Sequence, residues 1–280
     1  MNAIEIRGLK KSYGDFTLSL DLTLPQGCIL GLIGENGAGK TTTIKSILGI
    51  RRPDAGKIRV LGQDNGRDFA PVRERIGVVL DEAGFPDCLT ARQLGRVMAG
   101  IFRNWDGADY AGYLERLAVP TDKAYKDFSR GMKMKLSIAV ALSHHPELLV
   151  LDEPTSGLDP VVRDEVVEIF SEFTRDEEHA VLISSHIVSD LEKLCDYIAF
   201  LHQGKLLLCE EKDALREEYG LVQLSKTDFA ALDGSAVIGS RSTPFGVSAV
   251  VRRDAVPAGL VVEPVSLEDL FILMVKEEER

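Results

Sequence analysis

The sequence has few of the features that mark secreted, metal-binding or membrane-spanning proteins. Its 280 residues include only four cysteines, and none has the CxxC spacing of a zinc or redox pair. No apolar run reaches the length of about eighteen residues that a membrane-spanning helix needs, and the charged N-terminus lacks a signal-like apolar run. These absences favour a protein of a reducing cytosol that has no metal cluster and reaches a membrane only through a partner.

A broad excess of basic residues is also missing. The chain has 33 lysines and arginines against 44 aspartates and glutamates, a net charge of -11 at pH 7. Nucleic acid is bound through a basic face, so this balance argues against nucleic acid as a partner. With 45% hydrophobic and 28% charged residues, the chain can form one large core, or one core plus a small appendage.

Apolar patterning predicts an α/β fold. Continuous apolar runs at 28–33, 76–80, 148–151 and 180–184 are typical of strands covered on both faces, and several precede helical patterns. They predict a mainly parallel sheet flanked by helices. Residues 16–24 instead alternate and predict a half-buried strand, whose apolar face carries Phe16, Leu18, Leu20, Leu22 and Leu24.

Two segments differ from this pattern. Residues 87–130 have helical periodicity with no strand between the helices, which predicts a helical insertion. After about residue 215, short β-prone pieces alternate with turn signals and end in an amphipathic segment. We therefore expect two domains, a larger one over 1–215 and a small α+β accessory domain over 216–280.

Residues 31–43, GLIGENGAGKTTT, contain the GxxxxGK[ST] spacing of a phosphate-binding loop between an apolar strand and a helical segment. Glycines let backbone N–H groups surround phosphate oxygens, Lys40 reaches the outer phosphates, and Thr41 offers a hydroxyl to Mg²⁺. A nucleotide and Mg²⁺ are the expected ligands. The predicted nucleotide contacts in this loop are Gly34, Asn36, Gly37, Ala38, Gly39, Lys40, Thr41 and Thr42.

A second acidic motif, LLVLDEP at 148–154, ends an apolar strand in two neighbouring carboxylates. Asp152 is the expected Mg²⁺ ligand, and Glu153, which points elsewhere, can take a proton from water as a general base. Glu153 and Lys40 are therefore predicted catalytic residues.

In order along residues 1–215, the chain has Tyr13, the loop 34–41, FSRGM at 128–132, LDEP at 151–154, SGLD at 156–159, and His186. This series resembles the ATP-binding subunit of an ABC transporter. The resemblance implies a P-loop NTPase core with the parallel sheet and helical insertion described above and an antiparallel β subdomain, to which the small C-terminal α+β appendage is added. It also implies ATP and Mg²⁺ as cofactors.

The resemblance assigns further roles to residues of this chain. Tyr13 would stack on adenine, and His186 would be a third catalytic residue that contacts the γ-phosphate and orients the attacking water. Asp159 would lie at a dimer seam, where it also suits a helix N-cap. The family usually has glutamine where this chain has Asp81, which we expect to contact Mg²⁺.

The segment DFSRGMKMKL, residues 127–136, departs from the LSGGQ consensus of that family at Arg130 and Met132, and matches it at Phe128, Ser129 and Gly131. Ser129 and Gly131 are predicted nucleotide contacts, because a helix start beyond Ser129 would direct free N–H groups at an anion. Arg130 adds a cation near the phosphates. The spacing also predicts a core-facing stripe formed by Met132, Leu136, Ala139 and Val140.

The resemblance implies partners and a location. Two such subunits face each other head to tail, as a homodimer or a heterodimer, and drive a separate transmembrane permease at the cytoplasmic face of the cell membrane. Within the family, the chain is similar to ATPases that export phenol-soluble modulins and other antimicrobial peptides. The face toward the permease is expected to include the 87–130 insertion with Phe102 and Trp105.

Two other functions compete with that of a transporter subunit. A GTPase is suggested by DEAG at 81–84 and SKTD at 225–228, but SKTD lies in the appendage, and GTPases do not carry LDEPTSGLD. A soluble ABC-type ATPase that acts on ribosomes or nucleic acid would resemble two fused cassettes, whereas this chain has one. Both alternatives are therefore disfavoured.

Overall fold

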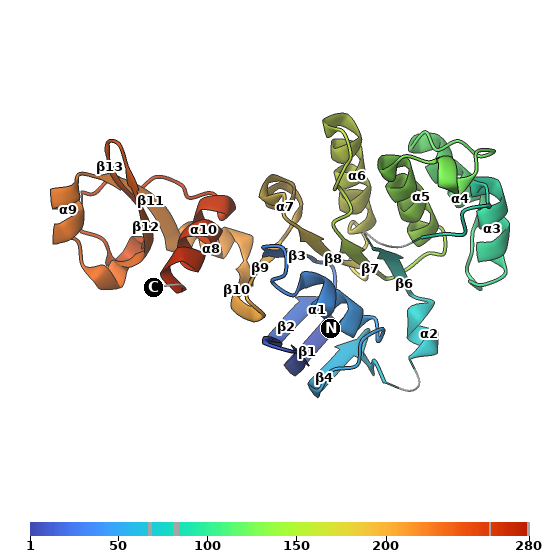
Figure 1. Ribbon diagram of the computed structural model, residues 1–280, viewed down its shortest axis with the longest axis horizontal. Coiled ribbons are helices and arrows are strands. Elements are labelled where there is room, and N and C mark those ends of the chain that lie inside the picture. Colours follow the sequence, from blue (N-terminus) through green and yellow to red (C-terminus); the bar gives the residue numbers. More distant parts are fainter. Residues whose placement is uncertain (67–68, 81–83, 258, 279–280) are drawn as a thin grey trace.

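Two sheets organise the part of the chain that the computed structural model describes, residues 1–66, 69–80, 84–257 and 259–278. In these residues the first sheet has ten strands in the order β5-β4-β1-β2-β10-β9-β3-β8-β7-β6, and the second has three in the order β11-β13-β12. Figure 1 shows the smaller sheet at one end of the molecule and the helical region of α3, α4 and α5 at the other.

The strand bounds are β1 (Asn2–Tyr13), β2 (Phe16–Pro25), β3 (Ile29–Gly34), β4 (Ala55–Val60), β5 (Gln63–Asp64), β6 (Ile76–Val79), β7 (Leu148–Asp152), β8 (Ala180–Ser185), β9 (Tyr197–His202), β10 (Lys205–Glu211), β11 (Tyr219–Leu224), β12 (Val237–Thr243) and β13 (Gly246–Arg252). The helix bounds are α1 (Lys40–Ile47), α2 (Ala70–Arg73), α3 (Ala91–Ala99), α4 (Gly107–Arg116), η1 (Tyr125–Asp127), α5 (Arg130–Leu142), α6 (Pro160–Phe173), α7 (Val188–Leu194), α8 (Lys212–Glu218), α9 (Lys226–Ala231), η2 (Gly234–Ala236), η3 (Arg253–Ala255) and α10 (Leu267–Glu278). No helix among these described residues is long and apolar enough to cross a membrane.

Strands β9, β3, β8, β7 and β6 pair in parallel and form the centre of the large sheet. Every residue of β3, β7 and β8 is buried, as expected of parallel strands covered on both faces. Leu149 and Leu151 of β7 pack in one core with helices α3 to α7, whereas Leu148 and Val150 pack in another core with α1. Helices therefore cover both faces of the parallel strands.

The antiparallel strands β1, β2 and β4 extend this sheet on one side. In β2 the predicted alternation is confirmed, because Leu18, Leu20, Leu22 and Leu24 are at most 4% exposed. The predicted α/β fold, with a parallel sheet between helices and an antiparallel part, is therefore confirmed.

The described residues of 219–278 form a small core of their own, and helix α10 among them packs into the main core. Val222, Ala249 and Val251 form the small core in the three-stranded sheet. Helix α10 instead joins the larger core, where the Phe271 ring lies 5.2 Å from that of Phe200 on β9. The proposed domain boundary between residues 215 and 216 stays a prediction.

Candidate nucleotide-binding site

The loop 35–39 joins the end of β3 to the start of α1. A Cβ atom at Gly34 would lie 2.5 Å from the carbonyl oxygen of Leu201, so a side chain there would force the backbone apart. Gly39 has a φ of 115°, which favours glycine. The first N–H groups of a helix have no partner within it and attract anions. The loop and the start of α1 therefore fit a phosphate group.

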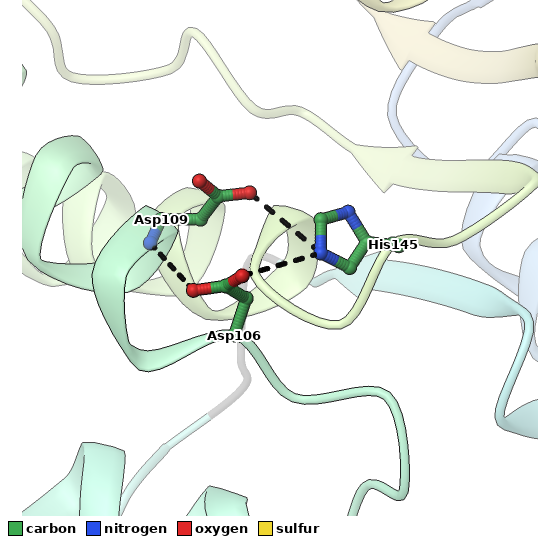
Figure 2. Close-up of side chains that lie close together, drawn as sticks. All are labelled: Asp106, Asp109 and His145. Carbon is green, nitrogen blue, oxygen red and sulfur yellow. Dashed lines mark hydrogen bonds and ion pairs between the residues drawn. The ribbon is translucent and has the colours of Figure 1, made fainter.

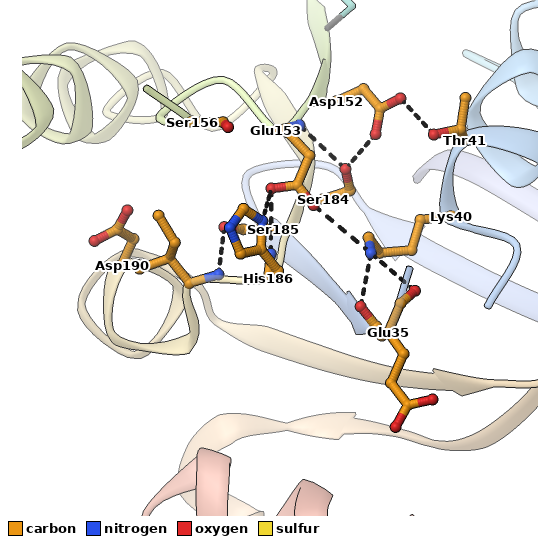
Figure 3. A network of polar contacts seen from close by, with 12 residues as sticks. Glu35, Lys40, Thr41, Asp152, Glu153, Ser156, Ser184, Ser185, His186 and Asp190 are labelled. Carbon is orange, nitrogen blue, oxygen red and sulfur yellow. Dashed lines mark hydrogen bonds and ion pairs between the residues drawn. The ribbon is translucent and has the colours of Figure 1, made fainter. Parts of the chain in front are cut away.

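Lys40 is 6% exposed at the start of α1. Its Nζ atom donates hydrogen bonds to the carbonyl oxygens of Gly34, at 2.6 Å, and Glu35, at 3.3 Å. The same atom lies 3.6 Å from Oε1 of Glu153 (Figure 3). A buried ammonium group needs such partners. The ammonium group of Lys40 is thereby held between the loop and the carboxylate of Glu153, the residue that follows β7.

Asp152 ends β7 beside the start of α1. Its Oδ2 accepts a hydrogen bond of 2.8 Å from Oγ1 of Thr41, and its Oδ1 accepts one of 2.5 Å from Oγ of Ser184 (Figure 3). Mg²⁺ prefers hard oxygen ligands such as the hydroxyl and the carboxylate that Thr41 and Asp152 bring together. These two residues therefore fit a magnesium ion.

Glu153 has a φ of 53°, which is uncommon for a residue other than glycine. Such backbone strain concentrates at functional sites. The Glu153 N–H donates to the carbonyl oxygen of Ser184 at 3.1 Å, and Oε2 of Glu153 lies 2.6 Å from Nδ1 of His186. The carboxylate is thereby held between Lys40 and His186 (Figure 3), where it can accept a proton from water.

A cavity of about 320 Å³ is lined by the phosphate-binding loop, the start of α1, and Asp152 and Glu153. Tyr13 does not line it; the side chain is 42% exposed at the end of β1, with Nζ of Lys11 at 5.6 Å from the ring centroid. Ala38, a residue of the loop, is buried and does not line the cavity either. The residues that line the cavity are Phe16, Glu35, Asn36, Gly37, Gly39, Lys40, Thr41, Thr42, Asp152 and Glu153.

Three predicted nucleotide contacts lie elsewhere in the chain. Ser129 caps α5, since its Oγ accepts from the N–H of Met132 at 3.3 Å, and Gly131 follows in the first turn. Asp159 caps α6 through a bond of 3.1 Å from the N–H of Val162. None of Ser129, Gly131 and Asp159 is among the described residues that line the cavity. Asp81 lies outside the described residues.

The predicted stripe on α5 is confirmed. Leu136, Ala139 and Val140 are buried, and Met132 is partly buried against the same core. Met134 is buried too, at 5% exposure, so the apolar face is wider than the spacing indicated. The helix thus packs on the core along its length, while Ser129 and Arg130 at its start are exposed.

Asp106, Asp109 and His145 form a second cluster of groups that bind metals in other settings (Figure 2). Asp106 is the N-cap of α4, and the backbone N–H groups of Asp109 and Ala108 lower the pKa of its carboxyl group. The Nε2 atom of His145 lies 3.7 Å from Asp109 and 3.9 Å from Asp106, with all three side chains 43% to 57% exposed. Helix capping and surface charge pairing account for this cluster, and we assign no ligand to it.

The SKTD segment that resembles a guanine-binding motif is also explained locally. Ser225 caps α9, its Oγ accepting from the N–H of Asp228 at 3.1 Å. The segment belongs to the region of the small sheet and does not line the nucleotide cavity. It forms the start of a helix.

Three residues of the site were not among the predicted contacts, namely Ser184, Phe16 and Glu35, the last of which lines the cavity. Ser184 is fully buried and joins Asp152 to the N–H of Glu153, at 3.2 Å from the latter. Phe16 lines the cavity, although the alternation of β2 indicated only a buried face. The position of Ser184 could have indicated its role. It lies one residue before the end of β8, and the carboxyl ends of parallel strands meet at this edge of the sheet.

The fold and the site together define a P-loop ATPase of the ATP-binding cassette class. Residues 18–156 match the family model described as ABC transporter. The chain is 38% identical over 209 residues to the bacitracin transport ATP-binding protein BcrA of Bacillus licheniformis, covering 73% of this chain and 68% of that one. It is 33% identical over 300 residues to the Nod factor export ATP-binding protein I of Rhizobium sp. (strain N33), covering 99% and 98% of the two chains.

Among solved structures, the chain is similar to one described as the ATP binding subunit of an ABC transporter. The TM-score is 0.68 at 27% identity, over 76% of this chain and 92% of that one. The chain belongs to the family of ABC transporter ATP-binding subunits and is an ATPase subunit of a transporter.

Proposed function

We propose that residues 34–42, which comprise the loop and the residues on either side of it, bind the phosphates of Mg²⁺-ATP and that Glu153 is the general base for hydrolysis. Bound Mg²⁺ supplies Lewis-acid stabilisation of the phosphate charge, and Thr41 and Asp152 would hold it. Lys40 would contact the outer phosphates, and His186 would orient the attacking water. The observation that carries this proposal is the position of the Glu153 carboxylate, 2.6 Å from Nδ1 of His186 and 3.6 Å from Nζ of Lys40.

We further propose that the working unit is a head-to-tail pair of ATPase subunits. Ser129, Gly131 and Asp159 do not line the cavity of their own chain, so in the pair they would face the nucleotide that the partner subunit holds. All the required groups occur in this one chain, which favours a homodimer. Ser129→Arg should abolish hydrolysis and leave ATP binding by the monomer intact. Turnover that is unchanged in this variant would contradict the composite site.

An apolar groove of about 800 Å³ is our proposed docking site for a helix of a transmembrane permease. The groove lies between β6, the end of α1, and helices α3 and α5. Its rim carries Ile50 and Ile101, which are 56% and 58% exposed, and Arg73 and Glu74 add charges beside them. This combination suits an amphipathic segment. The chain would thereby lie at the cytoplasmic face of the membrane through its permease.

Copurification tests this docking site. Ile101→Asp should reduce recovery of the chain with its coexpressed permease, because it places a charge at the rim of an apolar groove. Val261→Asp, at a side chain that is 77% exposed in the C-terminal region, is the matched control and should leave recovery unchanged. Equal recovery of both variants would exclude the groove.

For the cargo, we propose amphipathic or antimicrobial peptides, following the relative named for bacitracin transport. The relative named for Nod factor export matches along nearly the whole chain, so its cargo provides the comparison. The experiment is ATP hydrolysis by the complete transporter in vesicles, with bacitracin-like peptides, a Nod factor, or no addition. Stimulation by the peptides alone supports peptide export, and stimulation by the Nod factor alone excludes it.

A further inference from the structure

Arg130 is the first residue of α5, next to the N-cap Ser129. A cation is disfavoured at this end of a helix, because the helix dipole is positive there. The first turn of α5 also contains no acidic residue. A favourable contact elsewhere is therefore needed to explain an arginine at this position.

The structure contains such a contact. The Nη2 atom of Arg130 donates a hydrogen bond of 3.2 Å to Oγ of Ser156, in the turn between β7 and α6. The arginine stem then crosses Gly157, where a Cβ atom would lie 3.4 Å from Cδ and 3.7 Å from Nε of Arg130. Gly157 also has a φ of 76°, a backbone conformation that favours glycine, while the arginine stem lies at ordinary van der Waals distance from it.

A second pair of residues brings the same two segments together. A Cβ atom at Gly131 would lie 3.4 Å from Cδ2 of Leu158 and 3.5 Å from the carbonyl oxygen of Gly157. The start of α5 and the turn 156–159 therefore lie close together at adjacent residues, and the hydrogen bond from Arg130 to Ser156 joins them directly. Arg130 supplies the polar part of this contact.

The turn connects two residues of the proposed mechanism. At its beginning, the N–H of Ser156 donates to the carbonyl oxygen of Glu153 at 3.1 Å. At its end, Asp159 caps α6. A constraint on Ser156 and Gly157 therefore acts on the segment that runs from the proposed base to the residue proposed to face the partner subunit.

We propose that Arg130 is a positioning residue that fixes the turn 156–159 to the start of α5, so that Ser129 and Asp159 approach the partner subunit as one rigid surface. This inference rests on the proposed head-to-tail pair for its effect on turnover. The contact itself belongs to the single chain and can be tested there.

The first experiment measures hydrogen exchange of the backbone amides of residues 156–159 in the nucleotide-free monomer. Arg130→Met keeps the length of the stem and removes the donor, and Ser156→Ala removes the acceptor. Because each variant loses a hydrogen bond to a charged group at the surface, we expect these amides to exchange about two- to tenfold faster than in the wild type. The double variant should exchange no faster than either single one. Unchanged exchange in both single variants overturns the proposal.

The second experiment measures kcat and KM for ATP hydrolysis together with ATP binding by the monomer. Arg130→Met and Ser156→Ala should both lower kcat by about two- to tenfold and leave monomer ATP binding unchanged. Arg130→Lys should recover part of the loss. Lys135→Met removes one positive charge from the same helix and is the control.

A fall in kcat for Arg130→Met alone, with Ser156→Ala at the wild-type rate, would overturn the positioning role and indicate that the guanidinium contacts the partner's nucleotide directly. If the unsubstituted chain forms no ATP-dependent dimer, the proposed pair fails. The exchange measurement would still decide whether Arg130 holds the turn.

Discussion

Glu153 and His186 follow neighbouring parallel strands, and Oε2 of Glu153 lies 2.6 Å from Nδ1 of His186. The other carboxylate oxygen lies 3.6 Å from Nζ of Lys40, on a third segment of the chain. The carboxylate is only 14% exposed, so its orientation is fixed by these two neighbours and by the strained backbone of Glu153. A base that is held in one place is the condition for efficient proton transfer from water.

Glu153→Gln should therefore lower kcat for ATP hydrolysis by about 10²- to 10⁴-fold, since the amide cannot accept the proton. ATP binding should be retained, because the loop 34–42 is unchanged. Steady-state hydrolysis and equilibrium ATP binding provide the two measurements. Glu178→Gln, at an exposed glutamate, is the control, and near wild-type hydrolysis by Glu153→Gln would refute the assigned base.

His186→Ala should also act on kcat rather than on stability. The imidazole is 55% exposed, so its removal leaves little buried surface unpacked, whereas Glu153 loses the imidazole that orients it and keeps only Lys40 and the backbone N–H of His186 as partners of its carboxylate. Misplacement of a reacting group costs about 10²-fold in rate, which is the expected fall in kcat. A thermal unfolding midpoint near that of the wild type would accompany it; a large drop in the midpoint with unchanged kcat would contradict this role.

The parallel half of the fold could be predicted from the sequence because burial on both faces leaves continuous apolar runs. The run at 148–151 became β7 and that at 180–184 became β8, and the polar residues after them meet at one edge of the sheet. The amphipathic segment predicted after the β-prone pieces became α10, but its pattern gives no information on which core it joins. Its contact with Phe200 is therefore a result of tertiary structure alone.

The site was predictable only where a motif marks it. Lys40, Asp152 and Glu153 belong to motifs of fixed spacing, and the structure brings them together. Ser184 has no such motif, since a serine near a strand end is common, and only the pairing of β7 with β8 places it beside Asp152. One of the β-prone pieces expected after residue 215, GLVV at 259–262, formed no strand. Glu263, which follows it, makes an isolated bridge to Leu221.

Ser184→Ala should weaken both the fold and the Mg²⁺ response. The hydroxyl is fully buried and donates to Asp152 at 2.5 Å, so its loss leaves a buried carboxylate oxygen without that donor. We expect the free energy of unfolding to fall by about 1–3 kcal/mol and the Mg²⁺ concentration for half-maximal hydrolysis to rise. Ser185→Ala is the matched control, since Ser185 bonds the N–H of Ile187 instead. An equal Mg²⁺ response in both variants would count against the role of Ser184.

Phe271→Ala should show that α10 stabilises the main core. The Phe271 side chain is 8% exposed and packs on Phe200. Removal of a buried phenylalanine costs about 3–5 kcal/mol of unfolding free energy. Phe245→Ala makes the same change at a side chain that is 98% exposed and should alter stability by less than about 0.5 kcal/mol. Denaturant unfolding measures both, and equal values would show that α10 is not held as described.

His144→Gln should flatten the dependence of stability on pH. His144 is 1% exposed, its ring stacks on Phe102 with centroids 4.0 Å apart, and Nε2 lies 3.2 Å from the carbonyl oxygen of Ile76. Burial lowers the pKa of this imidazole from its ordinary value of 6.5, and the neighbouring His145 lowers it further, whereas two backbone carbonyls oppose the shift.

The sign follows from this lowered pKa. Below pH 6.5 the unfolded chain takes up a proton that the folded chain does not. The free energy of unfolding therefore decreases as the pH is lowered from 6.5 toward the lowered pKa of His144 in the folded chain. The contribution of His144 to this slope is at most about 1.4 kcal/mol per pH unit. Glutamine keeps a donor for Ile76 and does not titrate. Urea unfolding between pH 8 and pH 5.5 should therefore give a shallower slope for His144→Gln than for the wild type, and equal slopes would mean that folding does not lower the pKa of His144.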